Sequence, residues 1–493
     1  MRLRGVFSPP GDKSISHRIA LISQVARGEC VVSNLAPGAD VRSSLEAVRL
    51  LGTEVRYEGD RVVIRSSGMH PGRGEARPPA NGAGEFPCPD PGNNGSRECD
   101  RPVLPGRQSS FLAATSGSRP VSGVLGDGGP GERTSCKKSL PPEGAVPGES
   151  TLRIDCGNSG TTMRLLMGIL AGQAGEFVLD GDESLRRRPM ERIAAPLRLM
   201  GAEITTESGR CPVTVSGTGL RGIAYELPMA SAQLKSAILL AGLQADGRTV
   251  VREKTPSRDH TERLVALCRG KIRTAGNEVE VERSELSLPE SLYVPGDPSS
   301  AAFFLCAAAI VPGSEVIAQR VLLNPTRTGF VGVLQRMGAD IDIEVQGDEP
   351  EPWGTVTVRY SPDLTGCEVL PEEIPSLVDE VPILALVATQ ARGATVFRGV
   401  SELRVKESDR LAAVSSQLGA MGAKMSGDES TLVVEGPVEL QPVGALDSFG
   451  DHRIAMTLRL AGLLIDSRPT IQGEESVVIS YPGFHETLER LVQ

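Results

Sequence analysis

The sequence has few of the features that mark a membrane or secreted protein. It contains no run of about eighteen apolar residues, the length that a membrane-spanning helix requires. Its basic start, Met1 to Arg4, reaches Pro9 and Pro10 without the apolar segment of a signal peptide. We therefore expect a cytoplasmic protein without a membrane partner.

Motifs for metals and nucleotides are also scarce. The nine cysteines are odd in number and include no CxxC pair, which is typical of reduced thiols and not of a disulfide or zinc framework. The five histidines form no HExxH motif. We expect neither a GxxxxGK[ST] phosphate loop nor a GxGxxG fingerprint, and therefore no nucleotide site. We therefore expect neither a metal nor a cofactor. The net charge of −10 argues against a general nucleic-acid binder.

Residues 66–150, taken approximately, differ in composition from the sequence around them. They are rich in Gly, Pro, Ser and Arg and lack aliphatic periodicity. Because such a segment buries too little apolar surface to offset its chain entropy, we predict a disordered insert. It could regulate the protein or bind a partner. A tolerated surface insertion or a sequence artefact is the favoured interpretation.

The rest of the chain repeats one pattern six times. An apolar, helix-like run leads into a short polar turn and then into a β-rich run. With the insert set aside, the copies follow one another at roughly 60 to 85 residues. Since six such units exceed one core, three units per domain is the natural division. The predicted fold class is α/β or α+β with internal pseudo-symmetry. The turns are centred on Gly28, Gly175, Gly247, Gly313, Gly393 and Arg468.

One position in the repeat carries the residues of greatest chemical interest. It lies upstream of each turn, at the expected start of the first helix of each unit, where backbone N–H groups are unpaired and the helix dipole is positive. If the units surround a pseudo-axis, six such helix ends converge on one anion site. The residues at this position are Lys13, Gly160, Gln233, Ser299, Asp379 and Arg453.

Cationic side chains near these helix starts strengthen the prediction of an anion site. Arg forks suit carboxylate and phosphate groups, and Lys supplies a point charge. The acids Asp379 and Glu407 among the cations suggest proton transfer between two anionic substrates. Taken singly, Asp379 could be a helix cap and the 404–410 run a solvated helix face. The recurrence at one repeat position favours a site. The cations are Lys13, Arg18, Arg164, Arg188, Arg258, Lys406 and Arg410.

Five motifs resemble the signatures of the 5-enolpyruvylshikimate-3-phosphate synthase family. They are the segments 11–18 (GDKSISHR), 157–164 (GNSGTTMR), 295–301 (PGDPSSA), 404–410 (RVKESDR) and 450–456 (GDHRIAM). The resemblance covers about 1–66 and 151–493. It implies two similar domains, each of three βαβαββ units, with chain crossings near Lys13 and Gly296. One domain would hold residues 1–12 and 296–493, and the other residues 13–295 with the insert.

The resemblance also implies a reaction. The enolpyruvyl group of phosphoenolpyruvate would pass to the 5-hydroxyl of shikimate 3-phosphate, with release of phosphate, in the shikimate pathway to chorismate and aromatic amino acids. Lys13 would touch both substrates, with Gln233 near both. Shikimate 3-phosphate would be held by Ser14, Arg18, Ser231, Ser257 and Lys406. Phosphoenolpyruvate would be held by Gly160, Arg188, Arg410 and Arg453.

Two carboxylates have implied catalytic roles in this reaction. Glu407 would protonate the methylene carbon of phosphoenolpyruvate, and Asp379, beside the substrates, would take the proton of the attacking hydroxyl. A helix N-terminus and nearby cations should lower the pKa of both groups, which suits neither role unless bound anions restore it. We expect a monomer.

Two alternatives stay open. The sister enzyme that transfers enolpyruvyl to UDP-N-acetylglucosamine shares the fold, but its members usually have asparagine after the early lysine, where this chain has Ser14. They also carry a cysteine on a mobile loop, whereas Cys211 lies in a strand-like segment. A non-catalytic anion-binding homologue is the second alternative. The joint presence of Lys13, Asp379, Glu407 and Arg453 argues against it.

Overall fold

The computed structural model describes residues 1–68, 151–465 and 468–493, and all of these belong to one compact unit. The predicted insert therefore lies outside the described residues, except at its start. There the last strand before it continues to Ser67, slightly past the expected boundary. The fold is mixed α/β, as the sequence predicts. None of the described helices is long and apolar enough to span a bilayer.

Three of the repeats fold into sheets of one pattern. In each sheet, a short first strand runs parallel to the second, the last strand is antiparallel to the second, and the third strand pairs with the last. The same order, first–second–last–third, holds in all three. The strands are β5 (Leu152–Asp155), β6 (Glu176–Asp180), β8 (Arg210–Ser216) and β7 (Glu203–Glu207); β9 (Ala224–Glu226), β10 (Thr249–Arg252), β12 (Glu278–Val281) and β11 (Ile272–Ala275); and β18 (Glu368–Val369), β19 (Gly393–Arg398), β21 (Thr431–Gly436) and β20 (Lys424–Gly427).

Two further sheets follow this pattern but take their first strand from a distant part of the chain. β1 (Arg4–Phe7) runs parallel to β15 (Glu315–Leu322), which pairs with β17 (Trp353–Arg359), and β17 pairs with β16 (Asp340–Gly347). β13 (Leu286–Ser287) and β14 (Ser291–Tyr293) run parallel to β2 (Ala26–Ser33), which pairs with β4 (Arg61–Ser67), and β4 pairs with β3 (Glu54–Glu58). In the sixth repeat, the described residues form the parallel pair β22 (Ala445–Asp447) and β23 (Thr470–Gln472).

The sheets form two groups: one contains β2, β6 and β10, and the other contains β15, β19 and β22. Because of the exchanged strands, the chain passes between these two groups of sheets twice. The two crossing segments hydrogen-bond to each other: Asp12 N donates to Pro295 O at 2.7 Å, and Asp297 N donates to Pro10 O at 2.7 Å. Gly11 and Gly296 form an isolated bridge between the segments. A Cβ on Gly11 would stand 1.7 Å from the carbonyl oxygen of Asn34, so only glycine fits this crossing.

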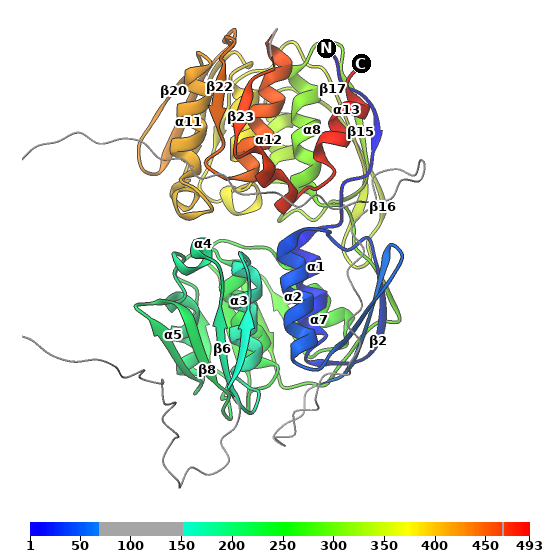
Figure 1. Ribbon diagram of the computed structural model, residues 1–493, viewed down its shortest axis with the longest axis vertical. Coiled ribbons are helices and arrows are strands. Elements are labelled where there is room, and N and C mark those ends of the chain that lie inside the picture. The colour runs from blue at the N-terminus through cyan, green and yellow to red at the C-terminus, as the bar shows by residue number, and fades with distance from the viewer. Residues whose placement is uncertain (69–150, 466–467) are drawn as a thin grey trace, which may run out of the picture. The chain divides into compact units, whose positions relative to one another are not determined.

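The helices of the described residues are distributed over both groups of sheets (Figure 1). Three of them, α1, α3 and α6, lie in one core, and α8, α10 and α12 pack together in the other. Short 3-10 helices span Ile374–Ser376, Ser401–Val405, Gly462–Leu464 and Glu474–Ile479. The α-helices are α1 (Lys13–Ile22), α2 (Ala39–Leu50), α3 (Gly160–Leu170), α4 (Glu183–Arg186), α5 (Glu191–Leu199), α6 (Ala232–Gly242), α7 (His260–Leu267), α8 (Pro298–Ile310), α9 (Gly329–Arg336), α10 (Val381–Ala388), α11 (Arg410–Ala420), α12 (His452–Ala461) and α13 (Phe484–Leu491).

Central helices of both cores are apolar on all sides because they are enclosed on all sides. α8 reads PSSAAFFLCAAAI after the cap Asp297, with proline at its first position, and every one of its residues is buried. α3 and α6 approach closely at Gly168, where a Cβ would stand 2.2 Å from the carbonyl oxygen of Ala237. Small residues thus set the spacing of the central helices.

Two hydrophobic clusters result from this packing. The first cluster runs from Ile15 to Val294, with Leu322 added. The second contains Leu3, Phe7 and residues between Ala301 and Leu491. The predicted domains, 1–12 with 296–493 and 13–295, would hold one cluster each, apart from Leu322. Their boundaries stay a prediction.

Candidate active site

The six residues singled out by the repeat lie at or beside helix starts. Lys13 and Gly160 are the first residues of α1 and α3, and Gln233, Ser299 and Arg453 are the second residues of α6, α8 and α12. Asp379 lies two residues before α10. Five of these helices are capped by a side chain that accepts a backbone N–H, which fixes the first turn of each helix. The caps are Asp12, Ser159, Ser231, Asp297 and Asp451.

A cavity of about 220 Å³ lies where most of these helix starts meet. The residues that line it come from elements of both hydrophobic clusters. Twelve of the residues that the family resemblance implies line it: Lys13, Ser14, Gly160, Arg188, Ser231, Gln233, Ser257, Asp379, Lys406, Glu407, Arg410 and Arg453.

Arg18 is the implied site residue that does not line this cavity. It is buried, and its guanidinium donates to Thr261 Oγ1 at 2.8 Å, to Ser236 Oγ at 3.1 Å and to the carbonyl oxygen of Ser14 at 3.0 Å. Three of its five N–H donors thus serve contacts within the protein, and through Ser14 Arg18 supports the wall from behind.

Asp379 stands among several cations. Arg258 Nη2 donates to its carboxylate at 2.7 Å and Arg410 Nη1 at 3.1 Å, and Arg453 Nε lies 3.6 Å away. Burial raises the pKa of this carboxyl, but the charges of Arg453, Arg258, Lys406 and Arg410 outweigh it and hold the pKa well below its usual range. Asp379 is thus ionised at neutral pH.

Glu407 has a similar environment. Arg410 Nη2 donates to its carboxylate at 2.6 Å, and Arg188 Nη2 lies 3.9 Å away. Burial opposes ionisation, yet the charge of Arg410, together with that of Arg188, lowers the pKa of Glu407 far below its ordinary value. The lowering expected from the sequence is confirmed for both carboxylates, so each is ionised at neutral pH.

Asp40 is a cavity residue that sequence reasoning missed. It lies in the first turn of α2 and forms an ion pair with Lys13. Burial raises the pKa of Asp40, but the charge of Lys13 and its hydrogen bond to this carboxylate bring the pKa below the ordinary value. Its place in the repeat could have indicated Asp40, because other units have a cation near the start of their second helix and this unit has an acid there.

The two histidines of the cavity wall are neutral at physiological pH. Burial, and then the charge of Lys13, lowers the pKa of His17 to about 3, and its Nδ1 shares a hydrogen with Ser44 Oγ at 2.8 Å. Burial lowers the pKa of His452 to about 4. Neither side chain adds charge to the cavity, which agrees with a structural role.

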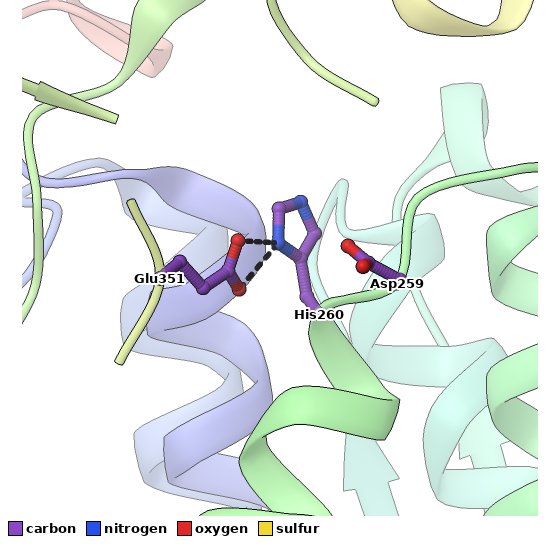
Figure 2. A group of neighbouring side chains, drawn as sticks. All are labelled: Asp259, His260 and Glu351. Carbon is purple, nitrogen blue, oxygen red and sulfur yellow. Dashed lines mark hydrogen bonds and ion pairs between the residues drawn. The ribbon is translucent and has the colours of Figure 1, made fainter. Parts of the chain in front are cut away.

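The described residues include one group whose geometry invites a test for metal binding: Asp259, His260 and Glu351 (Figure 2). His260 Nδ1 faces Glu351, with oxygens at 2.8 and 3.0 Å, and the other ring nitrogen points away from both carboxylates. Asn324 Nδ2 donates to Asp259 and to Glu351, each at 2.6 Å. A cation would have to displace this amide, whose orientation is held because Asn324 Oδ1 accepts from Thr326 N. The group fits a hydrogen-bonded cluster and not a metal site.

The expectation that no GxGxxG spacing occurs is wrong, because Gly217, Gly219 and Gly222 have this spacing. They join β8 to β9, and no helix follows them, so the loop lacks the helix N-terminus that holds a pyrophosphate.

Comparison with known proteins agrees with the fold and with the arrangement of the cavity. The sequence model of EPSP synthase (3-phosphoshikimate 1-carboxyvinyltransferase) matches residues 1–76 and 134–488. The chain belongs to the EPSP synthase family. A 3-phosphoshikimate 1-carboxyvinyltransferase of Geobacillus kaustophilus is 40% identical over 494 residues, covering 99% of this chain and 98% of the relative. One of Synechococcus sp. is 41% identical over 498 residues, with 99% and 95% covered.

Two solved structures superpose on the chain. An EPSP synthase from Acinetobacter baumannii has a TM-score of 0.76 and 35% identity, and the match covers 99% of this chain and 96% of that chain. The enolpyruvyl transferase NikO from Streptomyces tendae has a TM-score of 0.66 at 16% identity, with 99% and 95% covered, and shares the fold. The family thus accounts for almost the whole length of the chain.

Proposed function

We propose that this chain transfers the enolpyruvyl group of phosphoenolpyruvate to the 5-hydroxyl of shikimate 3-phosphate and releases phosphate. The observation that carries the proposal is the cavity: nine Lys and Arg side chains line it against five Asp and Glu, in a protein whose net charge is −10. Both substrates carry a phosphate and a carboxylate, so a local excess of cations suits them. Family membership supports the same reaction.

The cavity offers separate places for the two substrates. Gly160, at the first turn of α3, lies near the guanidinium groups of Arg188 and Arg164, which suits the phosphate or carboxylate of phosphoenolpyruvate. Arg410 and Arg453 extend this cationic wall. On the acceptor side we place Ser14, Ser231, Ser257 and Lys406, with Lys13 and Gln233 between the two substrates.

The two ionised carboxylates can act once substrates are bound. The anionic groups of the substrates offset the charge of Arg188 and Arg410, which raises the pKa of Glu407 and lets it carry a proton. Glu407 then gives that proton to the methylene carbon of phosphoenolpyruvate, and C2 becomes electrophilic. The 5-hydroxyl oxygen bonds to C2 while Asp379 accepts the hydroxyl proton. The tetrahedral intermediate then loses phosphate, which takes the proton from Asp379. The methyl group returns its proton to Glu407, which restores the double bond.

Phosphate release by the purified protein tests the proposal. The protein is given phosphoenolpyruvate with shikimate 3-phosphate or with UDP-N-acetylglucosamine, and Lys13→Met is compared with Lys254→Met, an exposed lysine that pairs with Glu226. We expect release only with shikimate 3-phosphate, a loss of about 10²- to 10³-fold in Lys13→Met, and no change in Lys254→Met.

Three results would contradict the proposal. Release that depends on UDP-N-acetylglucosamine would identify the sister reaction. Binding of both substrates by calorimetry without turnover would indicate a non-catalytic homologue. Full activity in Lys13→Met would show that the reaction does not take place in this cavity. The family match and the relatives, all named for the shikimate 3-phosphate reaction, do not favour the sister enzyme.

A further inference from the structure

Arg327 lines the cavity, yet the proposed reaction gives it no task. It lies between β15 and α9 and is 2% exposed. Its guanidinium forms ion pairs with Asp12 and with Asp297, the latter at 3.1 Å, and donates to Ser299 Oγ at 3.1 Å and to Ser14 Oγ at 3.4 Å. One side chain thus contacts both segments in which the chain crosses between its two groups of sheets.

The two aspartates that Arg327 holds are helix caps. Asp12 accepts from Ile15 N at 2.8 Å and caps α1, and Asp297 accepts from Ser299 N at 2.8 Å and caps α8. The second carboxylate oxygen of Asp297 accepts from the backbone N of Lys13 at 3.1 Å. The position of Lys13 therefore depends on both aspartates, and both aspartates depend on Arg327.

The charge of Arg327 is already matched within the protein. Asp12 and Asp297 are both buried, and together they carry two negative charges against one guanidinium. Although burial lowers it, the pKa of Arg327 is raised above its ordinary value by these aspartates. A planar fork can bridge two carboxylates and two hydroxyls at once, which a lysine ammonium cannot do in the same geometry. Both terminal nitrogens of Arg327 are thus engaged in contacts within the protein.

We propose that Arg327 is a positioning residue: it fixes the start of α1 against the start of α8 and so sets where Lys13 and Ser14 stand in the cavity. The inference rests on the proposed function for its effect on the rate, because Lys13 is placed there between the two substrates. Its structural part, the restraint on the two helix starts, stands on the contacts of Arg327 alone.

The loop that contains Arg327, residues 323–328, also contacts a third segment of the cavity wall. Asn324 donates to Asp259, the residue before α7 that follows the cavity residues Ser257 and Arg258. It also donates to Glu351, which lies between β16 and β17. The loop from Leu323 to Thr328 therefore contacts the starts of α1 and α8 and the segment before α7, and Arg327 supplies its ionic contacts to the first two.

The test compares Arg327→Met and Arg327→Lys with the control Arg336→Met. Arg336 is an exposed arginine of α9 that pairs with Glu373, away from the cavity. We expect kcat to fall about 100-fold in Arg327→Met and about tenfold in Arg327→Lys, with smaller changes in KM, because a displaced Lys13 affects the transition state more than substrate binding. Arg336→Met is expected to keep the wild-type kcat and KM.

Hydrogen exchange measured by mass spectrometry supplies a readout that does not depend on turnover. Positioning predicts faster exchange in peptides that cover residues 11–16 and 296–300, with unchanged exchange in the first turns of α3 and α6. Uniformly faster exchange in all core helices would show that Arg327 contributes only to overall stability, which contradicts the positioning role. Unchanged exchange at residues 11–16 would also overturn the proposal. If Arg327→Met does not fold, Arg327→Lys and the charge-neutral pair Asp297→Asn with Arg327→Gln are judged by the same criterion.

The two readouts separate this inference from the proposed function. A wild-type protein that does not release phosphate contradicts the proposed function. Hydrogen exchange at residues 11–16 and 296–300 of the variants then shows whether Arg327 restrains the two helix starts. A wild-type protein that turns over normally, with unchanged kcat in both Arg327 variants, contradicts the positioning role while leaving the reaction intact.

Discussion

Individual side chains determine the charge and the free space of the cavity. Gly160 illustrates the point, since its backbone conformation suits any residue but its surroundings do not. A Cβ at this position would stand 3.2 Å from Arg164 Nη1 and 3.4 Å from Arg188 Nη1. Both neighbours are the ends of flexible side chains, so the protein can accept the added methyl group only by moving the cations that we assign to phosphoenolpyruvate.

Gly160→Ala is therefore expected to fold normally and to raise the KM for phosphoenolpyruvate about tenfold, which corresponds to about 1.4 kcal/mol. The KM for shikimate 3-phosphate should change less, because its proposed contacts lie on other helices. Steady-state kinetics with each substrate varied in turn check this. Gly419→Ala in α11, where nothing lies within 4 Å of the new Cβ, is the matched control. Equal rises in both KM values would count against the assigned places.

Helices and sheets place these residues by close packing. The starts of α3 and α6 reach the cavity together because the two helices touch at Gly168, whose backbone lies against the carbonyl group of Ala237. Backbone atoms cannot swing aside as side-chain ends can. The spacing of the two helices thus depends on the absence of a side chain at one position.

Gly168→Ala is expected to lower the free energy of unfolding by about 3 kcal/mol, the upper end of the usual cost of overpacking a core. Gly332→Ala in α9 is the control: nothing lies within 4 Å of its new Cβ, and replacing a helical glycine should raise the free energy of unfolding by about 0.5 to 1 kcal/mol. Urea unfolding of the two variants beside the wild type measures both effects. An unchanged free energy of unfolding in Gly168→Ala would show that α3 and α6 can move apart to accommodate the methyl group.

For the whole molecule, the cluster around Glu351 connects segments that are far apart in the chain. Burial raises the pKa of this carboxyl to about 7, and the charge of Asp259 acts in the same direction. The folded protein then binds a proton that the unfolded chain releases near its ordinary pKa of 4.5. The stability from this group is fully present below pH 4.5 and is lost as the pH rises to about 7.

Glu351→Gln mimics the protonated carboxyl and removes this titration. Compared with the variant, the wild type should lose about 1.4 kcal/mol of stability per pH unit within this window, and about 3 kcal/mol in total. Urea unfolding of both proteins at pH 5, 6, 7 and 8 gives the difference directly. A difference that does not vary with pH would show that Glu351 is ionised throughout.

The insert provides a second prediction at this scale. The sheets on either side of it are complete in the described residues, since β4 pairs with β2 and β3, and β5 pairs with β6. Replacing residues 69–149 by a short Gly-Ser linker should therefore leave kcat/KM within a few-fold of the wild type. A deletion variant that is soluble and folded but inactive would assign the segment a role in activity.

Much of the architecture follows from the sequence because its causes are local. The period of the apolar residues and the turn glycines predict α/β repeats, and capping residues such as Ser159 mark the helix starts. The long motifs also suffice to indicate the family. Hydrogen bonds within a few residues and helix dipoles produce these features, so a stretch of sequence contains them entirely.

Only the tertiary structure decides which distant residues meet. Asp12 and Asp297 are separated by most of the first hydrophobic cluster's residues, and Arg327 unites them only because β1 joins the sheet of β15. The ion pair of Lys13 with Asp40, the burial of Arg18 behind the wall and the lowered pKa of Asp379 have the same origin. Charge interactions and burial depend on distance in space, and the sequence specifies that distance only after the chain has folded.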